Sequence, residues 1–205
     1  MARLIAALIR HADYQQWADV PSAHQPWPLN SQGESQAQEC VQIMFDMIMQ
    51  NGWSLVPSVD SSRLLRAWQT ATILAEGLAR LLNISLPVES HDALAERCVG
   101  SLANLTTVQI EAILRDDPRV SDPPVDWKAD SHYCLPLQGA ESLMQAGERV
   151  AAHVSQAMSA LPADERDRVK VFVGHGAAFR HAAFHLGVLE LEQLRQLSMF
   201  HCRPV

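Results

Sequence analysis

Residues 4–13 read LIAALIRHAD, an apolar run that stops abruptly at an arginine and a histidine. A run this short and continuous is typical of a strand buried on both faces, as in the centre of a parallel sheet. Ligands of open α/β sheets bind just beyond the carboxyl ends of such strands. The pattern therefore indicates that Arg10 and His11 stand at the mouth of a candidate site, although many strands end in polar residues for solubility alone.

Three later segments carry residues of complementary chemistry. Residues 61–71 read SSRLLRAWQTA, residues 94–97 read LAER and residues 172–176 read FVGHG. Arginine forks bind phosphate bidentately, and neutral imidazole is a competent nucleophile near pH 7. A carboxyl group can protonate a leaving oxygen. Together the four segments hold the groups that phosphoryl transfer needs.

In this order the four segments resemble the histidine phosphatase superfamily, which contains cofactor-dependent phosphoglycerate mutases and related phosphatases. The resemblance implies that His11 accepts the phosphoryl group while Arg10 and Arg66 grip the phosphate. His175 would complete the pocket as a donor to the developing charge. Glu96 would protonate the leaving group and later activate water. The implied fold is α/β, a three-layer α/β/α sandwich with a mostly parallel central sheet of the phosphoglycerate mutase-like type.

The sequence departs from the family pattern directly after each of the two histidines. Ala12 replaces the glycine that usually follows Arg-His, so the backbone there must avoid a conformation reserved for glycine. Gly176 follows the second histidine, where the histidine acid phosphatase branch has an aspartate. The sequence therefore favours the mutase-like branch.

Two further departures favour a phosphatase over a mutase. Cys98 and Val99 stand where the mutases typically carry His and Tyr, and only Arg115 and Arg119 could replace the paired arginines that mutases use on the far end of the substrate. We therefore expect hydrolysis of a phosphomonoester. A phosphoglycerate mutase-type phosphoryl transferase and a protein phosphohistidine phosphatase, usually a shorter chain, are the alternatives. A non-catalytic relative would lack one of the histidines or arginines.

The composition bounds the class of protein and its partners. The 205 residues, 48% of them hydrophobic, suffice for one domain with a substantial core, and no linker or repeat divides residues 1–205. The net charge of -7 and the lack of a basic block argue against nucleic acid and acidic membrane surfaces as partners. Membrane-helix and signal-peptide patterns are also lacking. We expect a cytoplasmic protein that binds a small-molecule phosphate ester, and make no prediction of its oligomeric state.

Neither the cysteines nor the other histidines show the spacing of a metal site. The four cysteines include no Cys-x-x-Cys pair, which is typical of reduced core residues. His181 and His185 lie one helical turn apart, but no third ligand is evident from the spacing. The sequence predicts no metal and no cofactor, because arginines and histidines can supply the charge stabilisation that Mg²⁺ gives elsewhere.

Apolar periodicity and turn residues predict the remaining elements. Helices are expected at residues 31–51, 61–82, 107–115, 139–160, 177–186 and 190–196, and strands at 55–60, 86–88, 169–173 and, as an edge strand, 198–205. Ser31 and Glu34 have the form of a capping box, and Ser61 or Ser62 can cap the second helix. Trp68 falls on the apolar stripe of that helix, and a charged turn is expected from Asp164 to Arg168.

Two irregular, proline-punctuated segments follow catalytic candidates: residues 14–30 follow His11, and residues 101–138 follow Glu96. Long irregular loops in compact domains often act as lids or binding loops. We expect these insertions to contact the non-phosphate part of the substrate, and their few basic groups suit a neutral or weakly polar moiety. The alternative is that they only shield hydrophobic helix faces. The candidate substrate-selecting residues are Trp17, Trp27, Trp127 and Tyr133.

Overall fold

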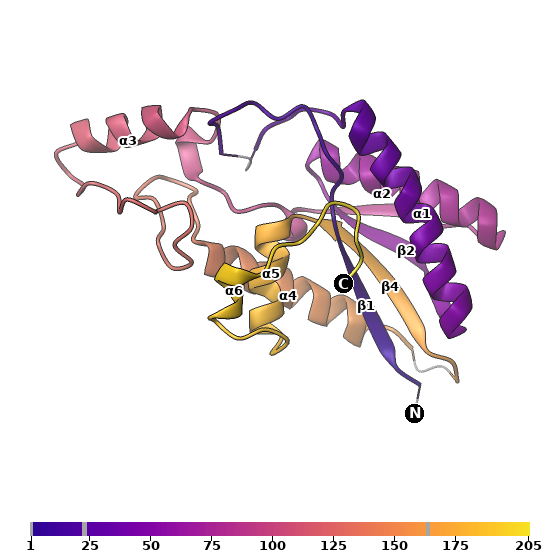
Figure 1. The fold of residues 1–205 in the computed structure, drawn as a ribbon. Helices are drawn as coiled ribbons and strands as arrows, with labels where there is room; N and C mark the ends of the chain where they lie inside the picture. The colour runs from indigo at the N-terminus through magenta and orange to yellow at the C-terminus, as the bar shows by residue number, and fades with distance from the viewer. Residues whose placement is uncertain (1, 22–23, 163–164) are drawn as a thin grey trace.

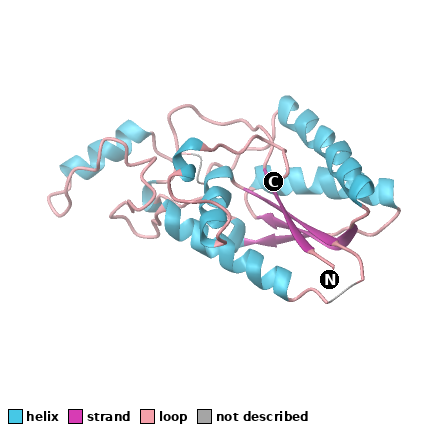
Figure 2. Cartoon of the chain, turned by 60° about the horizontal axis from the view of Figure 1, so that its bottom comes forward, coloured by secondary structure: helices cyan, strands magenta, loops and turns pink. Residues whose placement is uncertain are grey.

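The computed structural model describes residues 2–21, 24–162 and 165–205 of the chain. A central sheet of four parallel strands lies between helical layers, with strand order β1-β4-β2-β3 (Figures 1 and 2). The strands are β1 (Leu4–Arg10), β2 (Ser54–Ser62), β3 (Val88–His91) and β4 (Arg168–Gly174). The arrangement confirms the predicted α/β class and the three-layer α/β/α sandwich.

Helices cover both faces of the sheet. Helices α1 and α2 pack on one face, α4 and α5 pack on the other, and α3 lies beyond the end of the sheet (Figure 1). Two short 3₁₀ turns, Asp92–Leu94 and Gly100–Leu102, lie between β3 and α3. The helices are α1 (Ser31–Asn51), α2 (Leu65–Leu82), α3 (Thr107–Asp116), α4 (Leu143–Ser159), α5 (Gly176–His185) and α6 (Gln193–Gln196).

Each face of the sheet has its own hydrophobic core. Ile9 and Val171 point into the core beneath α1 and α2, whereas Leu8 and Phe172 point into the core beneath α4 and α5. Successive side chains of a strand point to opposite faces. The continuous apolar run of β1 therefore reflects burial on both faces, as the sequence predicts, and β4 is buried on both faces as well although Lys170 interrupts its apolar residues.

A third, smaller core lies in the insertion between Glu96 and α4. Its buried members are Val99, Ala103, Ile110, Leu114, Trp127 and Leu135. Trp127 is the largest of them and is 1% exposed. We call this group the satellite core. It gives the irregular insertion a hydrophobic centre separate from the two cores of the sheet.

The structure corrects the predicted start of α1. The side chain of Asn30 accepts a hydrogen bond from the amide of Gly33 at 2.8 Å, so Asn30 caps the helix. Ser31 is already the first helical residue, and the capping box predicted from Ser31 and Glu34 is wrong. Asparagine and serine cap helices about equally well, which is why the sequence pattern missed the shift by one residue.

The predicted cap of α2 is also wrong. Ser61 and Ser62 are the last residues of β2, and α2 begins after Leu64, which makes no side-chain capping bond. Trp68, expected on the buried stripe of α2, is 43% exposed. Because Ser62 ends a strand, its hydroxyl stands at the carboxyl edge of the sheet, where ligands of such sheets bind.

The C-terminal residues 198–205 do not form the expected edge strand. They join β1 through an isolated antiparallel bridge between Ile9 and Pro204, with backbone bonds between Leu8 and Val205. Cys202 has a left-handed backbone, at φ 52°, which breaks the extended path. We call residues 198–205 the C-terminal strap.

Two further predicted segments have different bounds in the structure. The helix expected at residues 190–196 is shorter, since α6 begins at Gln193. Part of the charged turn expected from Asp164 to Arg168 lies outside the described residues, and Arg168 already belongs to β4. The other predicted helices and strands lie within a few residues of their expected bounds.

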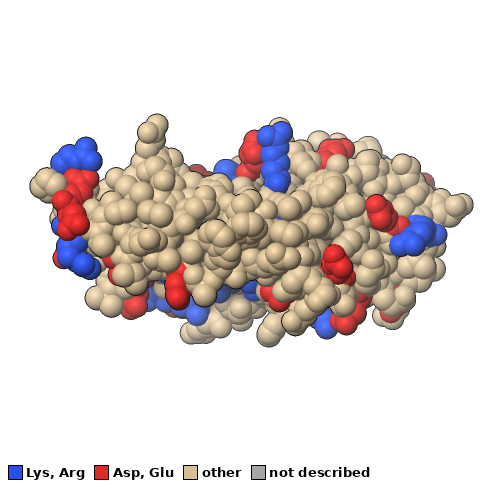
Figure 3. All heavy atoms as spheres, turned by 90° about the horizontal axis from the view of Figure 1, so that it is seen from above, with Lys and Arg blue, Asp and Glu red and all other residues tan. Residues whose placement is uncertain are grey.

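The surface is mixed in charge. Basic and acidic side chains are interspersed on the face that Figure 3 shows. Within the described ranges, the helices are all too short or too polar to cross a membrane.

Candidate active site

The carboxyl ends of β1 and β4 bring the two predicted histidines together. The strands are parallel neighbours in which Arg10 pairs with Gly174, and His11 and His175 each follow directly. The two imidazole rings lie 5.1 Å apart between centroids. The convergence that the resemblance implies is therefore present in the structure.

Arg66 lies between the two histidines and contacts both. It is fully buried in the first turn of α2. Its Nε donates to His11 Nε2 at 3.2 Å, and its Nη2 lies 3.3 Å from His175 Nδ1. Its Nη1 donates to the carbonyl of Gln25 at 3.1 Å, and its guanidinium lies 4.7 Å from the ring centroid of Tyr14. Burial lowers the pKa of Arg66, but a guanidinium keeps its charge at any working pH.

Hydrogen bonds define which nitrogen of His11 carries its lone pair. Nδ1 lies 2.7 Å from the carbonyl oxygen of Ala12, which can only accept, so Nδ1 holds the proton. Nε2 therefore holds the lone pair and accepts the Nε–H of Arg66. Burial first, and the charge of Arg66 second, hold the pKa of His11 well below its usual range. The ring is neutral at pH 7, the state that a nucleophile requires.

His175 is held in the opposite tautomer. Its Nδ1 faces the guanidinium of Arg66, which can only donate, so Nδ1 accepts and Nε2 carries the proton. That Nε2–H donates to the hydroxyl of Ser62 at 2.9 Å. Burial and the nearby Arg66 hold the pKa of His175 well below its usual range. Ser62 thus orients a catalytic candidate, a role that sequence reasoning missed by treating it as a helix cap.

Thr70 connects the end of β1 to α2. Its hydroxyl accepts the amide of Ala12 at 3.0 Å and donates to the carbonyl of Arg66 at 2.7 Å. Ala12 is not among the residues with positive φ, so the absence of the family glycine imposes no backbone strain there. This confirms the expectation that the chain avoids a glycine-only conformation.

Arg10 lies at the entrance, next to the start of α5. Its Nη1 donates to the carbonyl of Met199 at 2.8 Å. Burial lowers the pKa of Arg10, and the carboxylate of Glu96 opposes that shift. A Cβ on Gly176 would lie 3.0 Å from Arg10 Cδ, so the glycine leaves room for the arginine. The amide end of α5 begins at the same point and favours anions there.

The C-terminal strap packs against the end of β1 and against His11. His201 Nδ1 donates to the carbonyl of His11, and the two rings lie 5.4 Å apart between centroids. The amide of Cys202 donates to the carbonyl of Arg10 at 3.0 Å. Nothing in the sequence pattern joins residue 201 to residue 11, because only the fold brings these distant segments together.

A cavity of about 210 Å³ lies over His11. Glu96 is the carboxylate of its lining, and the Oε1 of Glu96 accepts the amide of Arg97 at 2.9 Å. We call this cavity the phosphate pocket. It is lined by Arg10, His11, Tyr14, Gln16, Glu96, Gly176, Ala177, Arg180, Ser198 and Met199.

A larger cavity of about 710 Å³ shares four lining residues with the phosphate pocket and so adjoins it. We call it the outer cavity. Both irregular insertions contribute to its walls. Val20 and Pro21 come from one, and the other supplies Pro124, Asp126, Lys128, Ala129, Asp130 and Ser131. The shared residues are Gln16, Glu96, Ala177 and Arg180.

Arg180 and Tyr14 line the phosphate pocket but were not predicted. Arg180 Nη1 donates to the carbonyl of Leu197, while its buried Nε has no hydrogen-bond partner among the described residues. The Tyr14 ring meets His11 edge to face at 5.4 Å, and its buried hydroxyl also has no such partner. The only sequence signal was position: Arg180 follows His175 on the next helix, and Tyr14 follows His11 by three residues.

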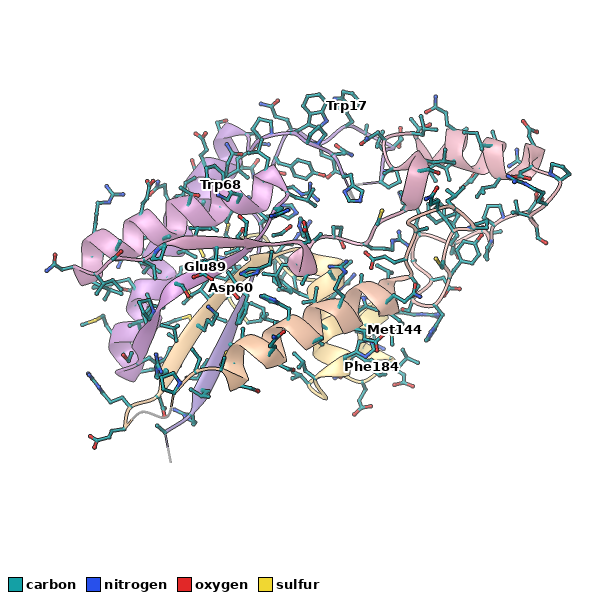
Figure 4. The ribbon with its side chains drawn as sticks, turned by 180° about the vertical axis from the view of Figure 1, so that it is seen from behind. Trp17, Asp60, Trp68, Glu89, Met144 and Phe184 are labelled. Atoms are coloured by element: carbon teal, nitrogen blue, oxygen red, sulfur yellow. The ribbon has the colours of Figure 1, made fainter. Side chains whose placement is uncertain are left out.

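The four aromatic candidates of the insertions line neither cavity. Trp17 and Trp27 lie against each other at 4.7 Å between ring centroids, and Trp17 projects outward, 53% exposed (Figure 4). Trp127 donates its indole N–H to Glu111 at 3.0 Å inside the satellite core, and Tyr133 packs against that core. Any effect of these side chains on substrate choice would pass through the segments that they support.

The possible substitutes for the mutase arginines are also away from the two cavities. Arg115 and Arg119 are absent from both linings. Arg119 pairs instead with Asp117 at 2.7 Å on the surface.

Comparison with known proteins agrees with this arrangement. The family model described as Histidine phosphatase superfamily (branch 1) matches residues 6–203. No curated protein sequence matches the chain. Among solved structures, a mycobacterial glucosyl-3-phosphoglycerate phosphatase is similar with a TM-score of 0.70 and 23% identity, over 96% of this chain and 85% of that one.

Other solved structures are similar to the same extent. An alpha-ribazole phosphatase from Shigella flexneri has a TM-score of 0.69 and 21% identity, over 97% of this chain and 87% of that one. A protein described as mycobacterial hydrolase 1 has a TM-score of 0.71 and 24% identity, over 97% and 86% of the two chains. At identities of 21–24%, these similarities show that the chains share a fold.

Proposed function

The chain belongs to the histidine phosphatase superfamily, and we propose that it hydrolyses a small phosphomonoester through a covalent phosphohistidine on His11. The observation that carries the proposal is the state of His11. Its neutral ring has its lone pair on Nε2, next to the buried cation Arg66 and facing a cavity whose lining includes a carboxylate.

The proposed reaction has two steps. In the first, the Nε–H of Arg66 turns from His11 Nε2 to a phosphate oxygen, which frees the Nε2 lone pair to attack phosphorus. The ester P–O bond breaks as the N–P bond forms, and Glu96 gives its proton to the leaving oxygen. In the second, Glu96 takes a proton from water, the water oxygen attacks phosphorus, and the N–P bond breaks. The products are the alcohol, inorganic phosphate and free His11.

Positive groups surround the site where charge develops. Arg10 and Arg66 would hold the nonbridging oxygens, and the amide end of α5 adds a favourable dipole. In this structure the Nε2–H of His175 donates a hydrogen bond to the hydroxyl of Ser62. For His175 to become a donor to phosphate, its Nδ1 must be protonated and must give up the hydrogen bond that it accepts from Arg66. A bound phosphate favours both changes, because its negative charge opposes the field of Arg66 and its oxygens accept the guanidinium N–H.

The outer cavity would hold the non-phosphate part of the substrate. Its lining has four basic side chains, Arg97, Lys128, Arg180 and Arg195, and three acidic ones, Glu96, Asp126 and Asp130. This near balance suits a polar moiety of low net charge better than a second phosphate, which favours a hydrolase over a mutase.

We also retain a single domain over residues 1–205, a cytoplasmic location and metal-independent chemistry as parts of the proposal.

The test is a screen that measures inorganic phosphate released from sugar, nucleotide, glycerate and phosphonate-type phosphates. Wild type should release phosphate from at least one class, and His11→Ala should not. A parallel assay for transfer between the hydroxyls of phosphoglycerate separates the alternatives. Phosphoryl transfer without phosphate release would show a mutase, and activity only on a phosphohistidine protein would show a protein phosphatase.

A further inference from the structure

A second cluster of titratable side chains lies at the other edge of the sheet, outside the phosphate pocket. It joins Asp60 of β2, His91 at the end of β3 and His153 of α4. The three possible ligand atoms all lie within 4.8 Å of one another. A cavity of about 420 Å³ borders all three residues and shares no lining residue with the phosphate pocket.

We propose that Asp60, His91 and His153 form a binding site for a divalent transition-metal ion of the Zn²⁺ type. Two imidazoles and one carboxylate are a donor set that Zn²⁺ prefers, with a fourth position left for water. Zinc–nitrogen bonds of about 2.0–2.1 Å in a tetrahedron place ligand atoms about 3.3 Å apart. Asp60 Oδ2 lies 2.9 Å from His153 Nε2 and 3.7 Å from His91 Nε2, on either side of that spacing.

The ligand atoms are held in place but not all satisfied. His91 Nε2 is buried and has no hydrogen-bond partner among the described residues. The rings of His91 and His153 lie 4.4 Å apart between centroids, and both direct Nε2 toward the same carboxylate. An unpaired imidazole nitrogen costs free energy when buried, and a metal ion would satisfy it.

Neighbouring groups orient the carboxylate and offer a further ligand. Lys170 Nζ lies 2.7 Å from Asp60 Oδ1, so it fixes the carboxylate and leaves Oδ2 toward the histidines. Glu89 pairs with Asp60 across β2 and β3, and the two lie close together in Figure 4. Its Oε2 is 3.9 Å from His91 Nε2. The positive charge of Lys170 should weaken metal binding, and the negative charge of Glu89 should offset that effect.

Occupation of this site should stabilise the protein without taking part in hydrolysis. The three ligands come from β2, β3 and α4, so one ion would tie three elements together. An ion that binds the folded chain more tightly than the unfolded chain raises the free energy of unfolding. The metal site does not depend on the proposed function, because it shares no lining residue with the phosphate pocket. Chelation should therefore lower the unfolding temperature and leave the rate of phosphate release unchanged.

The experiment titrates chelator-treated full-length protein with Zn²⁺ by calorimetry and follows the unfolding temperature. One ion should bind per chain and raise that temperature. His91→Gln should weaken binding by at least about 100-fold, since loss of a supporting second-shell group alone costs about 10–100-fold. The His91 side chain is 31% exposed, so this variant should fold, and an unchanged circular dichroism spectrum would confirm that it does.

Two controls locate the ion. His132→Gln changes an exposed histidine outside the cluster, and His11→Ala removes an imidazole from the phosphate pocket. Both should bind Zn²⁺ as wild type does, and the Co²⁺ complex should lack the strong near-ultraviolet band of thiolate ligation. Absence of binding, unchanged binding in His91→Gln, loss of binding in His11→Ala, or a thiolate band would overturn the proposal.

Discussion

The phosphate pocket and the outer cavity are neighbours, yet different kinds of structure form them. Beneath the phosphate pocket, His11 and His175 come from the ends of two central strands and Arg66 comes from the first turn of a helix. All three are buried, and of the three it is His11 that lines the pocket itself. The outer cavity takes much of its wall from the two irregular insertions, one of which packs on the satellite core.

This difference suggests a division of roles, in which the phosphate pocket carries the chemistry and the insertions determine which substrate binds. Groups on strand ends and helix starts keep their geometry because the whole sheet supports them. An insertion with its own small core can change without disturbing that sheet, and low-stability segments are where binding loops are commonly found. We therefore expect damage to the phosphate pocket to remove turnover, and damage to the insertion to change stability and substrate preference.

Among variants that keep the nucleophile, the largest expected effect comes from Glu96, which lines both cavities. Glu96→Gln keeps the size of the side chain but removes the acid. Hydrolysis of alkyl phosphates should fall about 10²–10⁴-fold, the usual contribution of general acid catalysis, while an activated aryl phosphate should lose little. Steady-state rates on a series of leaving groups check this. Equal losses across the series would mean that Glu96 only positions other groups.

Arg66 should show the next largest effect, because it contacts both histidines. Arg66→Ala should lower kcat/KM by about 10²–10³-fold on every substrate, as loss of one charge-stabilising group typically does. The matched control is Arg63→Ala, three residues earlier, which removes a largely exposed arginine paired with Asp92. Similar losses in both variants, with intact circular dichroism, would argue against a local role for Arg66.

Trp127 tests the insertion side of the comparison. Trp127→Ala empties the centre of the satellite core and should cost about 3–5 kcal/mol of local stability, the usual range for a buried tryptophan. Hydrogen exchange should accelerate in residues 101–138, and KM should rise for substrates that reach the outer cavity, with turnover of a small aryl phosphate retained. Trp17→Ala, at an exposed site, is the control. A loss of kcat on the small substrate would show that the insertion supports the chemistry.

The free energy of unfolding should depend on pH because His11 and His175 are buried in their neutral forms. We expect this effect to be smaller than those of the substitutions above. Burial, with Arg66 second, lowers the pKa of His11 and His175 below the unfolded value of about 6.5. Because the unfolded chain then binds more protons, stability should decrease as the pH falls below about 6.5, by up to about 1.4 kcal/mol per pH unit for each group. Urea unfolding at several pH values measures this slope. His175→Gln should reduce it and His132→Gln, at an exposed site, should not.

The sequence predicted much of the fold because its signals were local. The continuous apolar run of β1, the mostly apolar residues of β4 and the apolar spacing of α1 identified these elements to within a few residues. Errors arose where tertiary context overrides local preference. Ser62 has the composition of a helix cap but ends a strand and bonds His175, and the C-terminal strap has strand-like residues but a left-handed Cys202.

In the candidate site, the sequence could predict the residues that belong to a motif and no others. His11, Arg66 and His175 lie together as the family resemblance implied, whereas Tyr14, Arg180 and His201 belong to no motif and are brought in by packing. The same limit applies to the metal cluster. His91 and His153 are 62 residues apart in the chain, and no zinc spacing could have joined them to Asp60.

The central claim is that His11 carries the phosphoryl group during turnover, and trapping that group tests it most directly. Wild type is mixed with labelled substrate, denatured at high pH to preserve N-linked phosphate, digested and analysed by mass spectrometry. The account predicts an acid-labile label on His11 that is absent from His11→Ala, which should also be inactive. Label on another residue, or full activity of His11→Ala, would contradict it.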